Sequence, residues 1–207
     1  MEQWPAVAGG NVETSQRIVD VLWGALGLAA ASQGTMNNFL FGNTKFGYYE
    51  TIGGGSGASA QGSGADAVHS HMTNTRLTDV EVLESRYPVR VVNFGIRRGS
   101  GGDGKHAGGC GMIREIEALE RLEVSLVTNR RWRVDGQFAG PYGLDGGGAG
   151  QPGENWWFDR EGTSHRLPSS VQQRIEVGER IRILTPGGGG WGRTMEQQEP
   201  DEAAQME

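Results

Sequence analysis

Cysteine is almost missing from this chain of 207 residues, in which Cys110 is the single example. One cysteine cannot form a disulfide framework within the chain, and it cannot build a zinc site made mainly of thiolates. This usage is typical of a protein of the reducing cytoplasm, where we place the chain. Cys110 lies in a glycine-rich turn without a close sequence signal for a base, which argues against a nucleophilic role.

Positive charge is also scarce. The chain has 19 lysines and arginines against 25 aspartates and glutamates, for a net charge of −6. No basic cluster is interleaved with aromatic residues, as a nucleic-acid interface would require. We therefore expect no nucleic-acid partner.

Long hydrophobic runs are lacking too. No secretory segment opens the sequence, and the apolar stretch from Val21 to Ala31 is too short to cross a bilayer. Arg17 and Asp20 stand just before it. We expect no membrane partner and interpret this stretch as part of a buried helix.

Nucleotide-binding motifs are weak or absent. No glycine-rich segment ends in the Gly-Lys-Ser/Thr of a phosphate-binding loop. Residues 99–104 contain spacings like those of the dinucleotide fingerprint, but they lie between predicted strands instead of opening a helix. This argues against nucleotide binding in that segment.

Glycine, in contrast, is abundant, at 36 of 207 residues. The glycines cluster in short runs without a three-residue period, which excludes collagen and favours tight turns or close approaches of backbone. A hydrophobic fraction of 36% is enough for one real core, and the length favours one domain or two small ones.

The residue patterns predict a mixed fold. Asn11 can cap a helix running to about Ala31, with Ile18, Leu22 and Leu26 on one face. A capping box at Thr78 starts a short helix over 79–86, which Pro88 ends. Apolar and polar residues alternate, or aromatic and β-branched residues gather, in the segments that we predict to be strands, namely 39–41, 47–52, 89–96, 112–117, 123–128, 173–177 and 180–184.

These elements define an α+β fold class. One long N-terminal helix and a short second helix are expected to pack on a mostly antiparallel β C-terminal half with glycine-rich loops. Residues 1–192 form the predicted domain, and residues 193–207 a disordered acidic tail.

Candidate functional residues flank the first glycine-rich loop, residues 53–64. His69 and His71 would point to the same face of an extended strand, which suits joint contact with a substrate, acid–base work or, alternatively, metal ligation without a third local ligand. Glu50 stands among apolar and aromatic neighbours, where partial burial would raise its pKa and make it a general base. The alternative is an outward-facing glutamate.

Four further residues are candidates for substrate binding. Asn74 and Arg76 supply a neutral dipole and a fixed cation, suited to a carboxylate or a developing oxyanion. Arg76 could equally pair with an acidic residue of the following helix. Asn37 and Asn38 end the polar turn over 32–38 and complete the set.

Several motifs together resemble a known family. They lie at residues 8–17, 31–38, 48–57, 69–76, 84–88, 99–102 and 185–192. In this order they are similar to the C-terminal portion of the hydantoinase B/oxoprolinase family, which includes N-methylhydantoinases, ATP-dependent 5-oxoprolinases and related ketone carboxylases. The resemblance covers the chain from about Ala6 to Gly192.

The resemblance implies hydrolysis of a cyclic amide such as a hydantoin or 5-oxoproline, or in some members carboxylation. It implies ATP on a hydantoinase A-type partner subunit, and no cofactor in this chain. Glu50, His69 and His71 would then be the catalytic residues, and Asn37, Asn38, Asn74 and Arg76 would contact the substrate.

Two departures from the family pattern qualify that expectation. Full-length members carry an N-terminal region with His and Asp motifs expected to hold a divalent metal, and this chain starts after it, so we expect it to need an N-terminal half as a partner. Ala107 and Cys110 stand where the family pattern has Arg and Asp. The competing interpretations are a non-catalytic remnant or assembly module, and a free-standing metal-binding β protein.

The predicted N-terminal helix also carries a physical expectation. Its apolar face requires a cover, part of which is expected in the absent N-terminal region, and uncovered faces of this kind drive association. The chain alone is therefore predicted to be poorly soluble or oligomeric.

Overall fold

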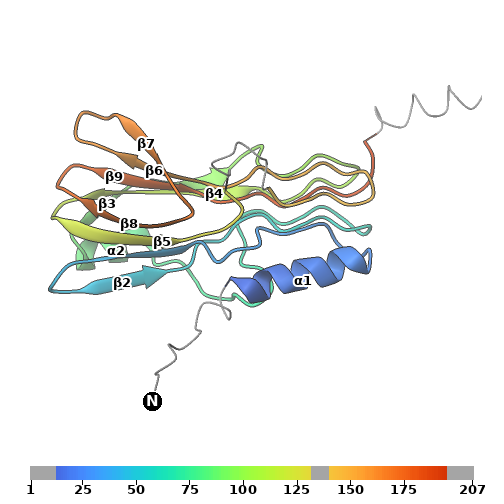
Figure 1. Ribbon diagram of the computed structural model, residues 1–207, viewed down its shortest axis with the longest axis horizontal. Helices are drawn as coiled ribbons and strands as arrows, with labels where there is room; N and C mark the ends of the chain where they lie inside the picture. The colour runs from blue at the N-terminus through green and yellow to red at the C-terminus, as the bar shows by residue number, and fades with distance from the viewer. Residues whose placement is uncertain (1–12, 132–139, 195–207) are drawn as a thin grey trace, which may run out of the picture.

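The structure is a computed structural model that describes residues 13–131 and 140–194. The molecule is elongated, with a β-sandwich at one end and a set of long extended segments at the other (Figure 1). Helix α1 (Thr14–Ala25) lies along the extended segments, and helix α2 (Val80–Arg86) lies beside the sandwich. The predicted cap Asn11 and the tail over 195–207 fall outside the described residues.

Two antiparallel sheets form the sandwich. The first has the order β2-β1-β5-β8, and the second has the order β3-β4-β9-β6-β7. The strands are β1 (Asn38–Gly42), β2 (Gly47–Glu50), β3 (Val89–Arg97), β4 (Gly111–Ala118), β5 (Leu122–Val127), β6 (Glu154–Phe158), β7 (Ser164–Leu167), β8 (Ser170–Ile175) and β9 (Arg180–Leu184). The α+β expectation with mostly antiparallel strands is broadly confirmed.

The hydrophobic core lies between these sheets. The first sheet contributes Phe39 and Leu126, and the second contributes Ile116, Ile181 and Ile183, all of them nearly inaccessible to solvent. Alternation along each strand places these side chains on the inner face. This is the pattern from which most of the strands could be predicted.

Strands β6 and β7 were not predicted. Trp156, Trp157 and Phe158 form a continuous aromatic run, so the alternation that identifies a half-buried strand is missing from β6. Strand β7 is short and has no apolar residue before Leu167. Their place at the edge of the second sheet is fixed by pairing of β6 with β9.

The first helix is shorter than predicted, because it ends at Ala25 and not near Ala31. Gly27 has φ +63°, and its N–H donates to the carbonyl of Gly24 while the N–H of Leu28 donates to that of Trp23. These two bonds form a Schellman motif, which closes a helix at a left-handed glycine. Residues 29–33 no longer belong to the helix.

The second helix lies where it was predicted, but Asp79 is its cap. The Asp79 carboxylate accepts from the N–H groups of Glu81 and Val82. The hydroxyl of Thr78, the predicted cap, instead donates a hydrogen bond to the Tyr48 oxygen, whose own proton goes to Glu50. Tyr87 is extended before Pro88, which ends the helix as expected.

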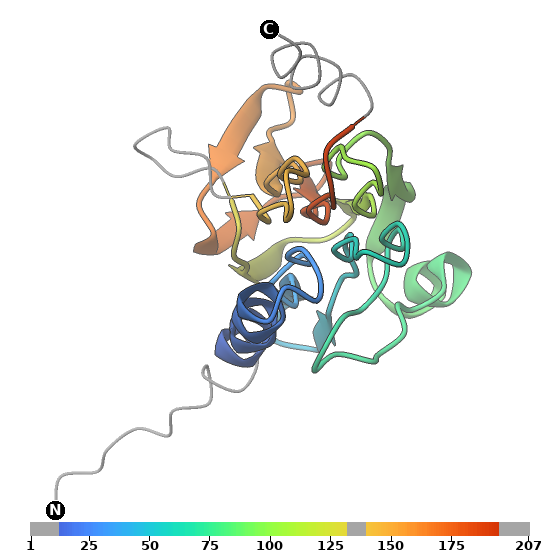
Figure 2. The same cartoon turned by 90° about the vertical axis from the view of Figure 1, so that its right-hand side faces the viewer.

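The glycine-rich segments, which were predicted to be loops, form an ordered bundle. Figure 2 looks along them and shows them as tight coils lying side by side. The N–H groups of Gly188 and Trp191 both donate to the segment over 106–109, whereas that of Gly189 donates to Ala31. Hydrogen bonds that reach the same neighbouring segment at every third residue are typical of a polyproline II helix. Such a helix has three residues per turn and no hydrogen bonds within itself, so its N–H groups donate to neighbouring segments.

Close approach of backbone explains why these residues are glycines. A Cβ on Gly187, Gly188, Gly189 or Gly190 would overlap a carbonyl oxygen of a neighbouring segment, and none of the four has a positive φ. The run is therefore glycine for reasons of space and not of backbone conformation. Of the two explanations offered by the sequence, close approach applies to this segment.

Candidate functional site

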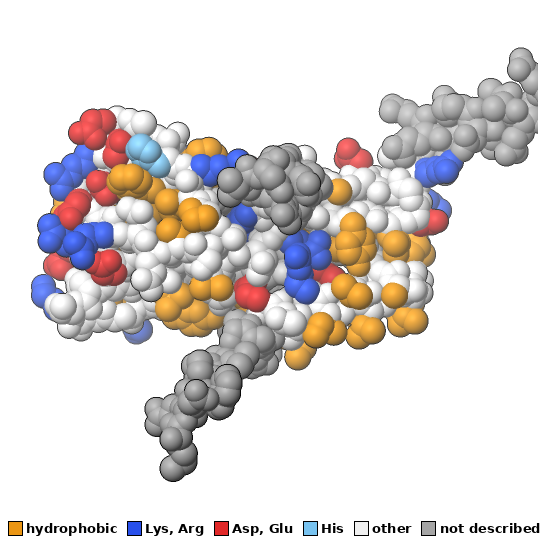
Figure 3. Space-filling view, viewed as in Figure 1, with side chains coloured by type: hydrophobic (Ala, Val, Ile, Leu, Met, Phe, Trp, Pro, Cys, Tyr) orange, Lys and Arg blue, Asp and Glu red, His pale blue; other side chains and the backbone are white. Residues whose placement is uncertain are grey.

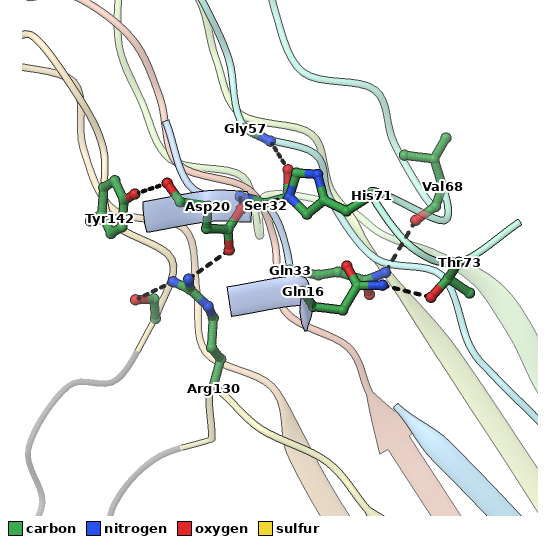
Figure 4. Close-up of polar contacts among 11 residues, drawn as sticks. Gln16, Asp20, Ser32, Gln33, Gly57, Val68, His71, Thr73, Arg130 and Tyr142 are labelled. Atoms are coloured by element: carbon green, nitrogen blue, oxygen red, sulfur yellow. Dashed lines mark hydrogen bonds and ion pairs between the residues drawn. The ribbon is translucent and has the colours of Figure 1, made fainter. Parts of the chain in front are cut away.

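A buried network of polar side chains lies where α1 meets the bundle. The face of α1 that points inward carries polar residues, so Gln16 and Asp20 are fully buried, and Glu13 just before the helix is buried too. Figure 4 shows Asp20 and Gln16 directed from α1 toward residues of the extended segments. Spacings of three and four residues place all three groups on one face of a helix.

Asp20 is the centre of this network. Its Oδ1 accepts from the backbone N–H of Ser32 at 2.9 Å and lies 2.8 Å from Nε2 of His71. Its Oδ2 accepts from Nη2 of Arg130 at 2.7 Å, and the Tyr142 hydroxyl donates to its backbone carbonyl (Figure 4). A carboxylate this deeply buried is stable because every oxygen is bonded.

His71 is held in one orientation by Asp20. A carboxylate can only accept, so Nε2 of His71 donates to it, and a neutral ring then has Nδ1 as its acceptor. The ring of Trp23 meets that of His71 edge to face, with 5.1 Å between centroids. The His71 backbone has φ +57°, so the strand geometry expected to place His69 and His71 on one face does not apply.

Unpaired polar atoms gather around the same segment. Gln16 donates from Nε2 to the Thr73 hydroxyl at 2.6 Å, but its Oε1 has no partner. Buried Nδ1 of His69 and Oγ of Ser70 are likewise unpaired. Burial lowers the pKa of His69, which keeps its ring neutral and able to accept a proton near neutral pH.

Asn37 and Asn38 are tied to other parts of the chain. The side-chain amide of Asn37 donates to Gln33 and to the carbonyl of Ile52, and its oxygen accepts from buried Arg131. Asn38 donates to Glu13 and accepts from the Tyr49 hydroxyl. Both asparagines therefore use their polar atoms within the protein.

Glu50 forms a separate buried ion pair inside the sandwich. Its Oε1 accepts from Nε of Arg114 at 3.0 Å, and its Oε2 accepts from Nη2 of Arg114 at 3.2 Å and from the Tyr48 hydroxyl at 2.8 Å. Both charged side chains are almost inaccessible, at 0% and 3% exposure. Burial together with the adjacent carboxylate raises the pKa of Tyr48.

The remaining predicted residues lie elsewhere on the surface. Asn74 and Arg76 are exposed on the segment that leads to α2. The structure thus brings His71 into a network with Asp20, and it places Glu50 in a different network. Two surface hollows, of about 790 Å³ beside β1, β2 and β5 and about 620 Å³ at the tip of the bundle, are lined by other residues.

Sequence reasoning missed the acidic and basic members of these networks, namely Glu13, Asp20, Arg114, Arg130 and Arg131. One signal was available, because Glu13, Gln16 and Asp20 repeat at helical spacing opposite the apolar stripe. The basic residues carried no comparable signal. A charged residue is rarely buried unless it is paired, and the partners of these residues lie far away in sequence, where no local pattern reveals them.

Metal and membrane features are absent from the part of the chain that the structure describes. In residues 13–131 and 140–194, no three His, Cys, Asp or Glu side chains are grouped so that they could hold a metal ion. The predicted pair of His69 and His71 thus has no third ligand there. Within the same ranges, no helix has the length and apolar character needed to cross a bilayer.

Comparison with known proteins identifies the family. The sequence profile described as hydantoinase B/oxoprolinase matches residues 2–194. The chain belongs to the hydantoinase B/oxoprolinase family. This confirms the resemblance stated from the motifs.

A curated relative strengthens the assignment to this family. The 5-oxoprolinase of Dictyostelium discoideum is 50% identical over 188 residues, which cover 91% of this chain and 14% of the relative. The chain thus spans about a seventh of the length of that relative.

Solved structures show the same fold at lower identity. An ATP-dependent caprolactamase from Pseudomonas jessenii has a TM-score of 0.65 at 22% identity, and the match covers 86% of this chain and 33% of that one. A nucleotide-free acetone carboxylase has a TM-score of 0.65 at 16% identity, covering 86% and 28%. In both, this fold is one portion of a longer chain.

Proposed function

We propose that this chain is part of an enzyme that hydrolyses the ring C–N bond of a cyclic amide, with 5-oxoproline or a hydantoin as substrate. The observation that carries the proposal is 50% identity to a 5-oxoprolinase across 91% of the chain. Because the chain spans a small share of that relative, the active unit includes further polypeptide of the same family type, with a hydantoinase A-type partner binding ATP.

Hydrolysis of a cyclic amide requires a base that activates water and donors that stabilise the oxyanion. His69 is suited to the base, because its buried Nδ1 is unpaired and burial, which lowers its pKa, favours the neutral ring that can accept a proton. It would take a proton from the water that adds to the ring carbonyl carbon, and the ring nitrogen would be protonated as the C–N bond breaks. His71, with its ring fixed by Asp20, would position the substrate or the water.

The contacts of the other candidates favour different roles. The Glu50 carboxylate is engaged by Arg114 and Tyr48, which supports a structural role over that of a general base. Asn37 and Asn38 would shape the site through their internal bonds. Asn74 and Arg76 are exposed and would contact the carboxylate of 5-oxoproline or a partner subunit.

A complementation assay tests the proposal. The D. discoideum 5-oxoprolinase is expressed without the stretch that matches this chain, the chain is supplied as a separate polypeptide, and ring opening of 5-oxoproline and hydantoin is measured with and without ATP. We expect ring opening that depends on the chain and falls by more than about tenfold in His69→Gln. His165→Gln, which alters a histidine on β7 beside Asp159, is the matched control and should leave turnover unchanged.

Two results would contradict the proposal. Assembly without ring opening of either substrate would reject the assigned reaction. Equal turnover with His69→Gln and with the wild-type chain would remove His69 from the mechanism.

A structural module is the alternative function. It is favoured by the pairing of the buried carboxylates of Asp20 and Glu50 with arginines, and by hollows that the candidate residues do not line. In that case the complementing chain would restore assembly of the enzyme, and turnover would be insensitive to substitution of both His69 and His71.

A further inference from the structure

Helix α1 is turned so that its apolar face is exposed to solvent. Ile18 and Leu22 are more than half exposed, and Leu26, just after the helix, is 69% exposed. Figure 3 shows hydrophobic side chains gathered where α1 lies in Figure 1. The apolar α1 face consists of Ile18, Val21, Leu22, Trp23, Leu26 and Leu28.

This exposure corrects the expectation of a buried helix and follows from the polar network. Asp20 is bonded to His71 and Arg130, and Gln16 is bonded to Thr73. Rolling the helix to bury its apolar face would expose these bonds and leave the buried Arg130 charge without its partner, which is strongly unfavourable. The polar network therefore fixes the apolar α1 face outward.

An exposed stripe of six large apolar side chains on one short helix and the turn that follows it is typical of an interaction surface. The stripe contains no charged side chain, and the exposed charge of the helix is Arg17 at its margin. A complementary surface would be apolar, with an acidic group placed opposite Arg17.

Lengths of the relatives indicate what covers this face. The stretch that matches this chain is 14% of the D. discoideum 5-oxoprolinase and 33% of the caprolactamase chain. In such proteins most of the polypeptide lies outside the matched stretch and is linked directly to it. We propose that the apolar α1 face is the surface on which this remaining polypeptide of the hydantoinase B/oxoprolinase unit docks.

A partner docked on the apolar α1 face would also affect the candidate site, through the contact between Trp23 and His71. Trp23 belongs to the apolar α1 face, is 43% exposed and contacts the ring of His71. A partner that covers Trp23 would fix the position of its indole and, through it, that of the His71 ring. The identity of the occupant rests on the proposed function, whereas the existence of the docking face rests on the geometry of α1.

The test uses the two polypeptides of the complementation assay and measures assembly, not turnover. Affinity is determined for the wild-type chain and for Leu22→Glu/Leu26→Glu, and hydrogen exchange is followed over residues 14–28. The control is Val82→Glu, which places the same charge at an exposed apolar position of α2. Circular dichroism of each free variant verifies folding, and Leu22→Ser/Leu26→Ser replaces the double glutamate variant if that variant does not fold.

We expect a complex with one copy of each polypeptide, slower exchange over α1 on assembly, and at least about a 100-fold loss of affinity in the double variant. Val82→Glu should bind within about twofold of the wild type. Complex formation without ring opening would reject the proposed function and leave this inference intact.

Three results would overturn the inference. The first is equal affinity of the double variant and the wild type, or unchanged exchange over α1. The second is no complex with the wild-type chain. The third is a dimer of the free chain that the double variant converts to a monomer, because the occupant would then be a second copy.

Discussion

The sandwich and the glycine bundle reach close packing by opposite means. In the sandwich, Phe39, Ile116 and Leu126 fill the space between sheets with side chains. In the bundle, carbonyl oxygens occupy the positions where side chains would start, as at Gly188 and Gly189. The bundle is thus held by contacts and hydrogen bonds between backbones, and the sandwich by burial of apolar area.

The difference predicts how each region tolerates change. A sandwich core loses stability in proportion to the atoms removed, because neighbours partly relax around a cavity. At the closely packed glycines of the bundle not even one added methyl group fits, since the obstructing carbonyl is fixed by its own hydrogen bonds. Small-to-large changes should therefore be most harmful in the bundle, and large-to-small changes in the sandwich.

The largest effect is expected from Gly188→Ala. The new Cβ would overlap the backbone carbonyl of Ser56, so we expect a loss of more than about 4 kcal/mol in unfolding free energy, or no soluble protein. Urea unfolding followed by circular dichroism measures it. The matched control is Gly62→Ala, at a glycine with open space and no positive φ, which should change stability by less than about 1 kcal/mol. Similar losses for the two variants would mean that the bundle is not packed as described.

A second, smaller effect is expected at the buried ion pair of Glu50 and Arg114, which is a polar contact within the sandwich core. Glu50→Gln leaves the buried Arg114 charge without its carboxylate partner, and we expect a loss of about 3 to 5 kcal/mol. Glu123→Gln, at the exposed pair with Arg174, is the control and should cost less than about 1 kcal/mol. If Glu50→Gln is as stable as the wild type but has lost turnover in the complementation assay, Glu50 is a catalytic base after all and not a structural group.

The smallest effect is a pH dependence at His69, which follows the glycine-rich segment over 53–64. Burial places its folded-state pKa below the unfolded value of about 6.5, so the unfolded chain binds the proton more readily. Stability should therefore be full above about pH 6.5 and decline as the pH falls below it. We expect a modest decrease in the melting temperature between about pH 7.5 and about pH 5.5, because the side chain is only half buried.

His69→Gln provides the comparison for this pH dependence. Removal of the titrating ring should make the decline between the two pH values smaller than in the wild type. A wild-type decline that His69→Gln leaves unchanged would assign the effect to other groups.

Much of the sandwich could be predicted because its strands obey local rules. Alternation identified β3, β4, β5 and β9, and the capping box read at Thr78 together with Pro88 marked α2, although Asp79 is the residue that caps it. The length of α1 could not be obtained this way, because apolar residues continue past Gly27 and the Schellman motif that stops the helix is a backbone geometry.

The candidate site was less predictable than the fold. Sequence pointed to His69 and His71, and the structure adds Asp20 from α1 and Arg130 from the segment that follows β5. Contacts between residues separated by 51 and 110 positions leave no local pattern. Whether these residues act on a substrate stays a prediction.

By itself, the sequence determined the family, the antiparallel character of the second half and the existence of two opposite stripes on the first helix. Tertiary structure decided which stripe faces inward, and it turned runs of glycine from apparent linkers into the packed centre of a bundle. The physical reason is the same in both cases. A helix stripe or a glycine run determines which kinds of surface a segment can pack against. The segments that pack against it come from distant parts of the chain, and their hydrogen bonds decide which face of the helix is buried and whether a glycine run is packed.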